Sequence, residues 1–249
     1  MTEELLFFKK RLDELASRAY ATGRYTYTDF LGLGEQDVLA QSLKDVEYAG
    51  LTTWGGGEEA ERVVVRFGEA NREEPWPFSC VHLCPLNEKF ADCLTHRDVL
   101  GALMNLGICR ETIGDIYLDG KHAYVFCLNT VLPILETELT RSKHTSLRCE
   151  VLEKLPDGVG NRKKRDTVLI ASERADAVVA AIYKLSRSEA SALFTDGKIY
   201  INGRQTLSCS FNMKENDVFS VRGFGRFVYS GVSGQSRKGR LYADVEIYV

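Results

Sequence analysis

The 249-residue sequence lacks the features that mark several common protein classes. No apolar run approaches the roughly 18 residues that a membrane-spanning helix needs, so a membrane protein is not expected. The opening residues, MTEELLFFKKRLDELA, are acidic and then amphipathic, unlike a signal peptide, which favours a cytoplasmic location. A glycine triplet occupies residues 55–57, but neither a Walker-type Lys-Ser/Thr nor a GxGxxG pattern accompanies it. We therefore interpret the triplet as a hairpin connection and not as a nucleotide site.

The cysteines lack the spacing of a disulfide framework. There are seven, an odd number, and without an export signal we expect them to be reduced and buried. Cys80, His82 and Cys84 alternate along one predicted strand, followed by Cys93 and His96. This is not a zinc-knuckle spacing, and consecutive strand positions rarely close a tetrahedron, so no metal site and no cofactor are expected. No third group is identifiable that would orient a Cys93–His96 nucleophile.

Charge is distributed unevenly along the chain. Residues 1–75 hold 9 Lys and Arg against 15 Asp and Glu, a net −6, and residues 76–160 hold 8 against 11, a net −3. Residues 161–249 hold 15 against 9, a net +6. The overall value of −3 therefore averages unlike parts. This asymmetry indicates an acidic scaffold that carries a basic C-terminal module suited to a polyanion.

We expect an α+β protein of three small domains, over residues 1–74, 75–160 and 161–249. The first is predicted to be an α/β domain with a helix over residues 3–21 and a helical stretch near 36–43. Two strand-like runs, VEYAGLTTW and RVVVRFG, follow. The first helix buries one stripe of residues at helical spacing: Leu5, Phe8, Leu12, Leu15 and Ala19.

The central domain is predicted to begin at the Pro-Trp-Pro run of residues 75–77. Its elements are expected to be strand (78–85), helix (95–106), strands (113–118 and 122–128), helix (130–140) and strand (146–153). Thr95 is a predicted N-cap with Asp98 completing a capping box, and Gly107 is a predicted helix stop. This element order is that of the split βαβ plait of ferredoxin-like and RNA-recognition (RRM-like) domains.

Alternation along these strands divides their side chains between two faces. One face is apolar and is expected to meet the helices: Val81, Leu83, Ile116, Leu118, Ala123, Val125, Cys127, Leu147 and Cys149. The other carries His82, Tyr117, His122, Tyr124, Phe126 and Arg148. Aromatic rings and an arginine on an open sheet suit base stacking. However, KHAYVFC lacks the glycine and the last aromatic of the RNP1 pattern, and a neighbouring domain covers such faces equally often, so both interpretations stay open.

The most informative stretch covers residues 174–226. It follows the basic run NRKKRD (161–166), which we interpret as a solvated linker or a phosphate-contacting arm. A helix over 173–184 is predicted, then a second helix that starts with the Ser186/Glu189 capping box and stops at Gly197. A strand follows, with Ile199 and Ile201 pointing one way and Lys198, Tyr200 and Asn202 the other. Asn202-Gly203 predicts a type I′ hairpin turn after it. Strands are predicted at 218–222 and 241–249, with a glycine-rich bend at 223–225.

These residues carry a family resemblance. R-x-D followed by SR-S-E-A, then L-x-x-D-G-x-I-x-I-N-G and N-D-x-x-S-V-R, resembles the S4 RNA-binding domain. SVRGFGRF with a later KGR, and KFADCLTHRDVLGALMNLGICRETIGDI from Lys89 to Ile116, resemble the YlmH-type S4-domain RNA-binding proteins of bacteria along the whole chain. The sequence departs from that pattern at Phe224, where a basic residue is often found, and in its extra cysteines.

The resemblance implies a non-enzymatic, monomeric protein that binds structured rRNA, and possibly tRNA, on the ribosome. The family is associated with quality control on large ribosomal subunits that still hold peptidyl-tRNA. An alternative is an RNA-modifying enzyme, of the pseudouridine synthase or rRNA methyltransferase type, with an appended S4 module. Such enzymes usually carry the module at the N-terminus, whereas here it is C-terminal and the preceding 160 residues show no catalytic pattern.

The resemblance also implies a contact surface on the C-terminal domain. By position, the S4 surface maps to Arg174, Lys184, Ser186, Arg187, Ser188, Lys198, Asn202 and Arg204. In this family Arg222, Gly223, Arg226, Lys238 and Arg240 extend it. Arg187 and Ser188 fall in the first turn of a predicted helix, whose free N–H groups and dipole favour a phosphate. The arginine fork suits bidentate phosphate contact, and Gly223 would let an RNA backbone approach closely.

Overall fold

The computed structural model describes residues 3–57, 60–69, 74–160 and 163–248, with side chains from Leu6 onward. The chain divides into two compact units, Met1–Gly160 and Asn161–Val249. Both contain helices and sheets, so the mixture of helices and sheets in the predicted α+β class is confirmed. A further boundary near residue 75, which would make three domains, stays a prediction. In the described parts of the chain, no helix combines the length and apolar character needed to cross a membrane.

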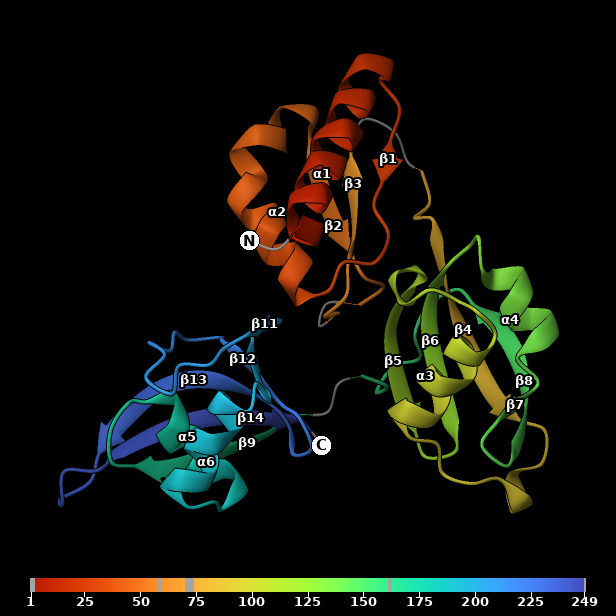
Figure 1. Cartoon of the computed structure of the whole chain (residues 1–249). Coiled ribbons are helices and arrows are strands. Elements are labelled where there is room, and N and C mark those ends of the chain that lie inside the picture. Colours follow the sequence, from red (N-terminus) through yellow and green to blue (C-terminus); the bar gives the residue numbers. More distant parts are fainter. Residues whose placement is uncertain (1–2, 58–59, 70–73, 161–162, 249) are drawn as a thin grey trace. The chain divides into compact units, whose positions relative to one another are not determined.

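The N-terminal part of the first unit packs two helices on a small sheet (Figure 1). The helices are α1 (Glu3–Thr22) and α2 (Leu33–Val46), followed by a short 3-10 turn, η1 (Glu47–Ala49). The strands β1 (Thr26–Tyr27), β2 (Leu51–Trp54) and β3 (Val64–Phe67) are ordered β1-β3-β2. The predicted stripe of α1 is buried at Leu12, Leu15 and Ala19, whereas the side chain of Leu5 lies outside the described residues. Antiparallel β2 and β3 confirm that the glycine triplet lies in a hairpin connection.

The rest of the first unit is a plait with the predicted element order. Its strands are β4 (Phe78–Pro85), β5 (Ile113–Asp119), β6 (His122–Leu128), β7 (Arg141–Ser142) and β8 (Thr145–Leu152). Its helices are α3 (His96–Asn105) and α4 (Leu132–Glu138), with 3-10 turns η2 (Glu88–Phe90) and η3 (Arg110–Thr112). The antiparallel sheet is ordered β5-β6-β4-β8-β7. The first and third main strands lie in the middle, as in a split βαβ plait.

Local signals in the plait are confirmed. Thr95 caps α3, and Asp98 completes the capping box through a 3.0 Å bond from the Thr95 amide. Gly107 ends the helix region with φ of 75°. The residues predicted to face the helices all belong to, or pack against, one core beneath α3 and α4. The period-2 division of the sheet into two faces therefore holds.

The opposite face of the plait is covered by the N-terminal part of the same unit. Tyr117, Tyr124 and Phe126 are 3%, 8% and 3% exposed and cluster with Phe30 and Val64. Hydrogen bonds also hold the two parts together, because the Arg62 guanidinium donates to the carbonyls of Ile113 (2.9 Å) and Phe30 (2.6 Å). These rings are not open to bases, so of the two interpretations of this face, coverage by a neighbouring part of the chain is the one the structure shows.

Gly56 lies against the Phe126 ring, where the N-terminal part of the unit covers the plait. Gly56→Ala should destabilise the first unit by at least about 2 kcal/mol. A Cβ at Gly56 would overlap the Phe126 ring, and φ is 96°, where L side chains are strained. Gly57→Ala is the matched control, because a Cβ at Gly57 meets nothing within 4 Å. Thermal unfolding followed by circular dichroism compares the two variants, and equal melting temperatures would contradict the packing described here.

The second unit is a six-stranded antiparallel sheet with two helices on one face (Figure 1). The strands are β9 (Lys163–Ile170), β10 (Ile199–Ile201), β11 (Arg204–Gln205), β12 (Val218–Val221), β13 (Gly225–Gln235) and β14 (Leu241–Tyr248). Their order is β11-β10-β12-β13-β14-β9. The helices α5 (Ala175–Tyr183) and α6 (Arg187–Thr195) pack on a core that includes Val178, Phe194, Phe219 and Phe227.

The local predictions for this unit hold at its turns. Ser186 and Glu189 form the capping box of α6, and Gly197 follows the helix with φ of 66°. Asn202 and Gly203 have φ of 49° and 76°, so both central residues of the hairpin turn are left-handed, as a type I′ turn requires. The helix pair and the hairpin predicted for an S4-like module are thus present, while the S4 assignment itself stays a prediction.

Two strands of this unit were not predicted. Residues 163–166, interpreted as part of a linker or arm, instead begin β9, which pairs with β14 along its whole length. β9 is an edge strand in which Lys164, Arg165 and Asp166 are exposed, so its sequence is strongly polar. β13 contains Gly231 and Gly234 at register shifts. Glycines at bulges interrupt the alternation of side chains, so the sequence of such a strand resembles that of a loop. Asn161, Arg162 and Val249 lie outside the described residues.

The expectation that all cysteines are buried holds fully only for Cys80 and Cys127. Cys84, Cys149 and Cys209 are partly buried, Cys93 and Cys109 are exposed, and every cysteine is free. Cys80 and Cys127 are buried, and burial raises the pKa of both thiols to about 12. Neither exposed cysteine lies in a strand: Cys93 is in the loop between η2 and α3, and Cys109 directly precedes η3.

Candidate nucleic-acid interface

Arg174 and Arg187, two of the predicted contacts, share one buried carboxylate. Asp176 is 2% exposed and accepts from Arg174 Nε at 3.0 Å and from Arg187 Nη2 at 3.2 Å. Burial opposes ionisation of Asp176, but the hydrogen bonds from the two guanidinium groups outweigh it and lower the pKa of this carboxyl. The two arginines are therefore fixed in orientation, and their side chains stay 40% and 50% exposed.

The N-terminus of α6 is less available to a phosphate than its sequence suggests. The Ser186 amide donates to Glu189 Oε2 at 2.8 Å, and Ser186 Oγ accepts from the Glu189 amide at 3.3 Å. Ser186 Oγ also lies 3.0 Å from Ser188 Oγ. The Glu189 carboxylate thus occupies the end of the helix that would attract an anion. Lys184, the left-handed C-cap of α5, is exposed beside it.

Asn202 is engaged inside the unit. Its side-chain amide donates to Asp217 Oδ1 at 2.8 Å, and its carbonyl oxygen accepts from the Val218 amide at 2.9 Å. These bonds brace the hairpin turn against β12 and leave Asn202 half-buried. Arg204, next to the turn on β11, is exposed.

Lys198, Arg222 and Arg226 project from the face of the sheet opposite to α5 and α6. Tyr200 pairs with Ser220, and Ser220 pairs with Arg226, so these side chains form a row across three strands. Tyr248 pairs with Lys163 and continues the row onto β14 and β9. We call this group the outer sheet face: Lys163, Lys198, Tyr200, Arg222, Arg226 and Tyr248.

Cations stack on both tyrosines of the outer sheet face. The Arg222 guanidinium carbon lies 4.6 Å from the centre of the Tyr200 ring, and that of Arg226 lies 4.9 Å from the centre of the Tyr248 ring. Lys163 Nζ lies 5.3 Å from the Tyr248 ring. Stacked guanidinium planes offer a surface for unpaired bases while their N–H edges reach phosphates.

Three residues of the outer sheet face were not among the predicted RNA contacts: Lys163, Tyr200 and Tyr248. Tyr200 had been placed facing away from the core, and its alternation with Ile199 and Ile201 was the available signal. Lys163 and Tyr248 had no such signal, because they join the face only through the pairing of β9 with β14.

Gly223 lies in the turn between β12 and β13, next to the outer sheet face. Its φ is 88°, and a Cβ there would meet nothing within 4 Å, so the turn surface is open. Lys238 and Arg240 are exposed but lie in the turn between β13 and β14. That turn is at the far end of β13, about 30 Å from Arg226 at the rise of a β-strand. The structure therefore does not bring these two residues together with Arg222 and Arg226.

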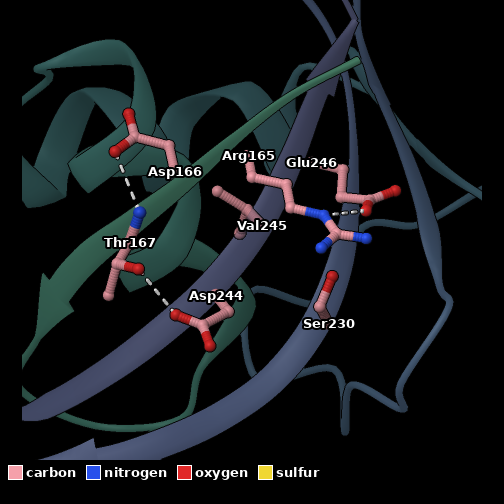
Figure 2. A pocket seen from close by; sticks show the side chains of 7 residues that line it. All are labelled: Arg165, Asp166, Thr167, Ser230, Asp244, Val245 and Glu246. Carbon is pink, nitrogen blue, oxygen red and sulfur yellow. Dashed lines mark hydrogen bonds and ion pairs between the residues drawn. The ribbon is translucent and has the colours of Figure 1, made fainter.

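An open hollow of about 590 Å³ lies over β9, β14 and β13 (Figure 2). Its lining includes Asp166, Asp244 and Glu246, with Arg165 bound to Glu246 at 3.0 Å. Thr167 Oγ1 donates to Asp244 Oδ1 at 2.7 Å. Three carboxylates against one guanidinium disfavour a phosphate. The basic, aromatic part of the sheet is thus confined to the end near the β12–β13 turn.

The plait carries a second basic region, away from its covered face. Arg97, Arg141 and Lys143 line a hollow of about 440 Å³ beside α3, together with Asp98 and Glu138. On the covered face itself, His82 is 15% exposed and Arg148 is 62% exposed, and Arg148 binds Glu150 at 2.7 Å.

The chain is thus a two-unit α/β protein with a plait in the first unit and a basic, aromatic sheet face in the second. The family model described as "Putative RNA-binding domain in YlmH" matches residues 81–155. "Ribosome-associated protein quality control protein P2" of Bacillus subtilis (strain 168) is 29% identical over 231 residues, 90% of this chain and 87% of that protein. The solved "Cell division protein ylmH from Streptococcus pneumoniae" aligns with 61% of this chain and 93% of its own, at 20% identity and a TM-score of 0.47. The family-model match and the B. subtilis relative confirm the resemblance to YlmH-type proteins that the sequence indicated.

Proposed function

We propose that this protein is a ribosome-associated RNA-binding factor that acts without catalysis. The observation that carries the proposal is the outer sheet face, where two arginines and a lysine stack on two tyrosines in a unit of net charge +6. A polyanion with exposed bases fits such a surface. The family model on residues 81–155 and the name of the B. subtilis relative support RNA and the ribosome as partners.

In its finer form, the proposal is a cytoplasmic, monomeric factor with a C-terminal S4-type unit. It binds structured rRNA, and tRNA where present, on large subunits that hold peptidyl-tRNA during quality control. The contact set is the outer sheet face with Gly223. Arg204 on β11 and the exposed parts of Arg174, Lys184 and Arg187 at the ends of α5 and α6 would form a second group of contacts outside that face. The Asp176 carboxylate is buried between Arg174 and Arg187, which supports a structural and not a catalytic role for it.

The RNA-binding proposal predicts a strong salt dependence. If about five phosphates are neutralised, a plot of log affinity against log salt concentration should have a slope of roughly −4. Affinity would then fall by roughly 200-fold for a fourfold rise in salt. Filter binding of the purified protein to a structured rRNA fragment measures this slope, and a slope near zero would count against a phosphate-contacting surface.

Association with the ribosome has a separate test. In sucrose gradients of cell lysate, the protein should sediment with large subunits at low salt and leave them at high salt, because phosphate contacts are screened. Finding the protein only at the top of a low-salt gradient would remove the ribosome from the proposal while leaving RNA binding to the filter assay.

A further inference from the structure

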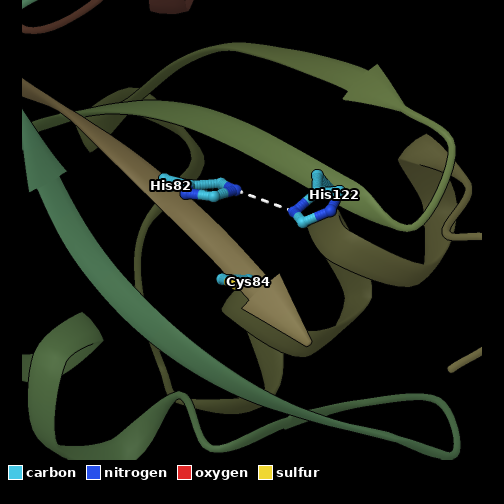
Figure 3. A group of neighbouring side chains, drawn as sticks. All are labelled: His82, Cys84 and His122. Atoms are coloured by element: carbon cyan, nitrogen blue, oxygen red, sulfur yellow. Dashed lines mark hydrogen bonds between the residues drawn. The ribbon is translucent and has the colours of Figure 1, made fainter. Parts of the chain in front are cut away.

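Three potential metal ligands lie close together on strands β4 and β6 of the plait, on the same face as the buried aromatic rings, and all three are half-buried (Figure 3). His82 and Cys84 lie on β4, and His122 begins β6. Leu83 pairs with Ala123, so the flanking residues Cys84 and His122 project from the same side of the sheet. The ligand atoms of the three side chains all lie within 4.8 Å of one another, and His82 Nε2 is 2.9 Å from His122 Nδ1.

A carboxylate faces the outer nitrogen of each imidazole. His122 Nε2 lies 2.7 Å from Glu88 Oε1, and His82 Nδ1 lies 3.7 Å from Glu150 Oε2. Carboxylates placed behind histidines in this way fix the tautomer and the ring orientation of metal ligands. With the outer nitrogens protonated, both inner nitrogens direct lone pairs into the space between the rings. The 2.9 Å contact between these nitrogens is a hydrogen bond whose donor depends on the tautomer, and a cation can take the place of its proton.

We propose that His82, Cys84 and His122 form a zinc site whose fourth position is left to water. Zinc–nitrogen and zinc–sulfur bonds of about 2.0 to 2.3 Å place tetrahedral ligand atoms about 3.3 to 3.8 Å apart. That range lies between the 2.9 Å and 4.8 Å limits of the cluster, so rotations of the side chains close the site. Two imidazoles and one thiolate select zinc over magnesium or calcium, which prefer oxygen ligands.

This inference departs from the sequence expectation of no metal site. From the sequence spacing, the possible ligands beside His82 and Cys84 were Cys80, Cys93 and His96. The structure buries Cys80 among aromatic rings at 3% exposure, and the group within ligand distance contains neither Cys93 nor His96. The missing ligand comes from the neighbouring strand, where only the sheet pairing reveals it. The site is independent of the RNA-binding proposal.

Cobalt(II) is the spectroscopic probe for this site. The full chain is stripped of metal with a chelator under reducing conditions and titrated with cobalt(II) alone. One equivalent should bind and give the intense visible bands of tetrahedral cobalt together with a near-ultraviolet sulfur-to-cobalt charge-transfer band. Zinc should then displace the cobalt and abolish both signals. A wild-type protein that gives neither band overturns the proposal.

Variants locate the site. Cys84→Ser should remove the charge-transfer band, and His122→Gln should weaken binding. Glu88→Gln changes an exposed side chain that no core depends on, and should lower cobalt affinity by roughly 10- to 100-fold. Cys93→Ser and His144→Gln are matched controls, because both residues are exposed, and they should bind like the wild type.

The outcome is decided by the pattern across these variants. Should Cys84→Ser fail to fold by circular dichroism, Glu88→Gln decides the question. Unchanged bands and affinity in both Cys84→Ser and Glu88→Gln overturn the proposal, as does loss of the charge-transfer band in Cys93→Ser.

Discussion

Replacing Arg222 and Arg226 by glutamate should weaken RNA binding by roughly 100-fold near 0.1 M salt, because each phosphate contact contributes close to one power of ten there. The log–log salt slope should also become shallower by about 2. Both guanidinium groups stack on tyrosines of the outer sheet face, so their loss removes the charge and the flat surface together. The filter-binding titration measures both quantities.

Two matched controls accompany this variant. Arg18→Glu with Arg24→Glu makes the same charge change at exposed positions of the acidic first unit and should leave affinity nearly unchanged. Lys238→Glu with Arg240→Glu tests the far end of the β13–β14 hairpin and should have the smaller effect. Equal losses in all three variants would mean that net charge, and not the outer sheet face, governs binding.

Replacing Asp176 by asparagine should destabilise the second unit by about 2 kcal/mol, which corresponds to a fall in melting temperature of roughly 10 °C. The change leaves two arginines without their shared carboxylate. The expected loss is below the 3–5 kcal/mol typical of a broken buried pair, an order-of-magnitude figure, because the two guanidinium groups are about half exposed and screened by water. Urea unfolding measures the free energy. Asp196→Asn, at a carboxylate 52% exposed, is the control and should change it little.

The contribution of Asp176 also depends on pH in a definite direction. The pKa of this carboxyl is lower in the folded protein than its ordinary value of 3.8, so the unfolded chain binds the proton more readily. The stabilisation is therefore complete above that ordinary value and is lost as pH falls through the lower folded pKa. The difference between wild type and Asp176→Asn should be large at about pH 7 and shrink at about pH 3. A difference that grows on acidification would contradict the sign of the shift.

The Asp176 pair also limits what charge reversal at Arg187 can show. A glutamate at position 187 would face the buried Asp176 carboxylate, which now lies 3.2 Å from the arginine. Loss of RNA binding in that variant could not be separated from loss of folding. Arg187→Gln keeps a donor toward Asp176 and is the better probe of a phosphate contact there.

The elements with their own local signals were predictable from sequence. Thr95 and Asp98 fix the start of α3, Gly107 fixes its end, and Asn202-Gly203 fixes a hairpin, because each acts within a few residues. β9 and β13 were missed for a physical reason. An exposed edge strand and a bulged strand with glycines both weaken the alternation on which strand prediction depends.

Features that depend on pairing between distant segments were not predictable from spacing. The outer sheet face needs the register of β10, β12, β13, β14 and β9 before Tyr200, Arg226 and Tyr248 become neighbours. The burial of Phe126 depends on the contact with Gly56, which is distant in the sequence. The group of His82 and Cys84 with His122 depends on the pairing of two strands. The predicted contact residues are divided among the α5–α6 ends, the outer sheet face and the far hairpin, a division that only the tertiary structure shows.

The most direct test of the central claim is ultraviolet crosslinking of the protein to RNA in living cells, followed by mass spectrometry of the linked peptides and sequencing of the RNA. The account predicts ribosomal RNA linked to peptides that contain Tyr200 or Tyr248 of the outer sheet face. Crosslinks confined to peptides within residues 81–155, or the absence of any linked RNA, would contradict it.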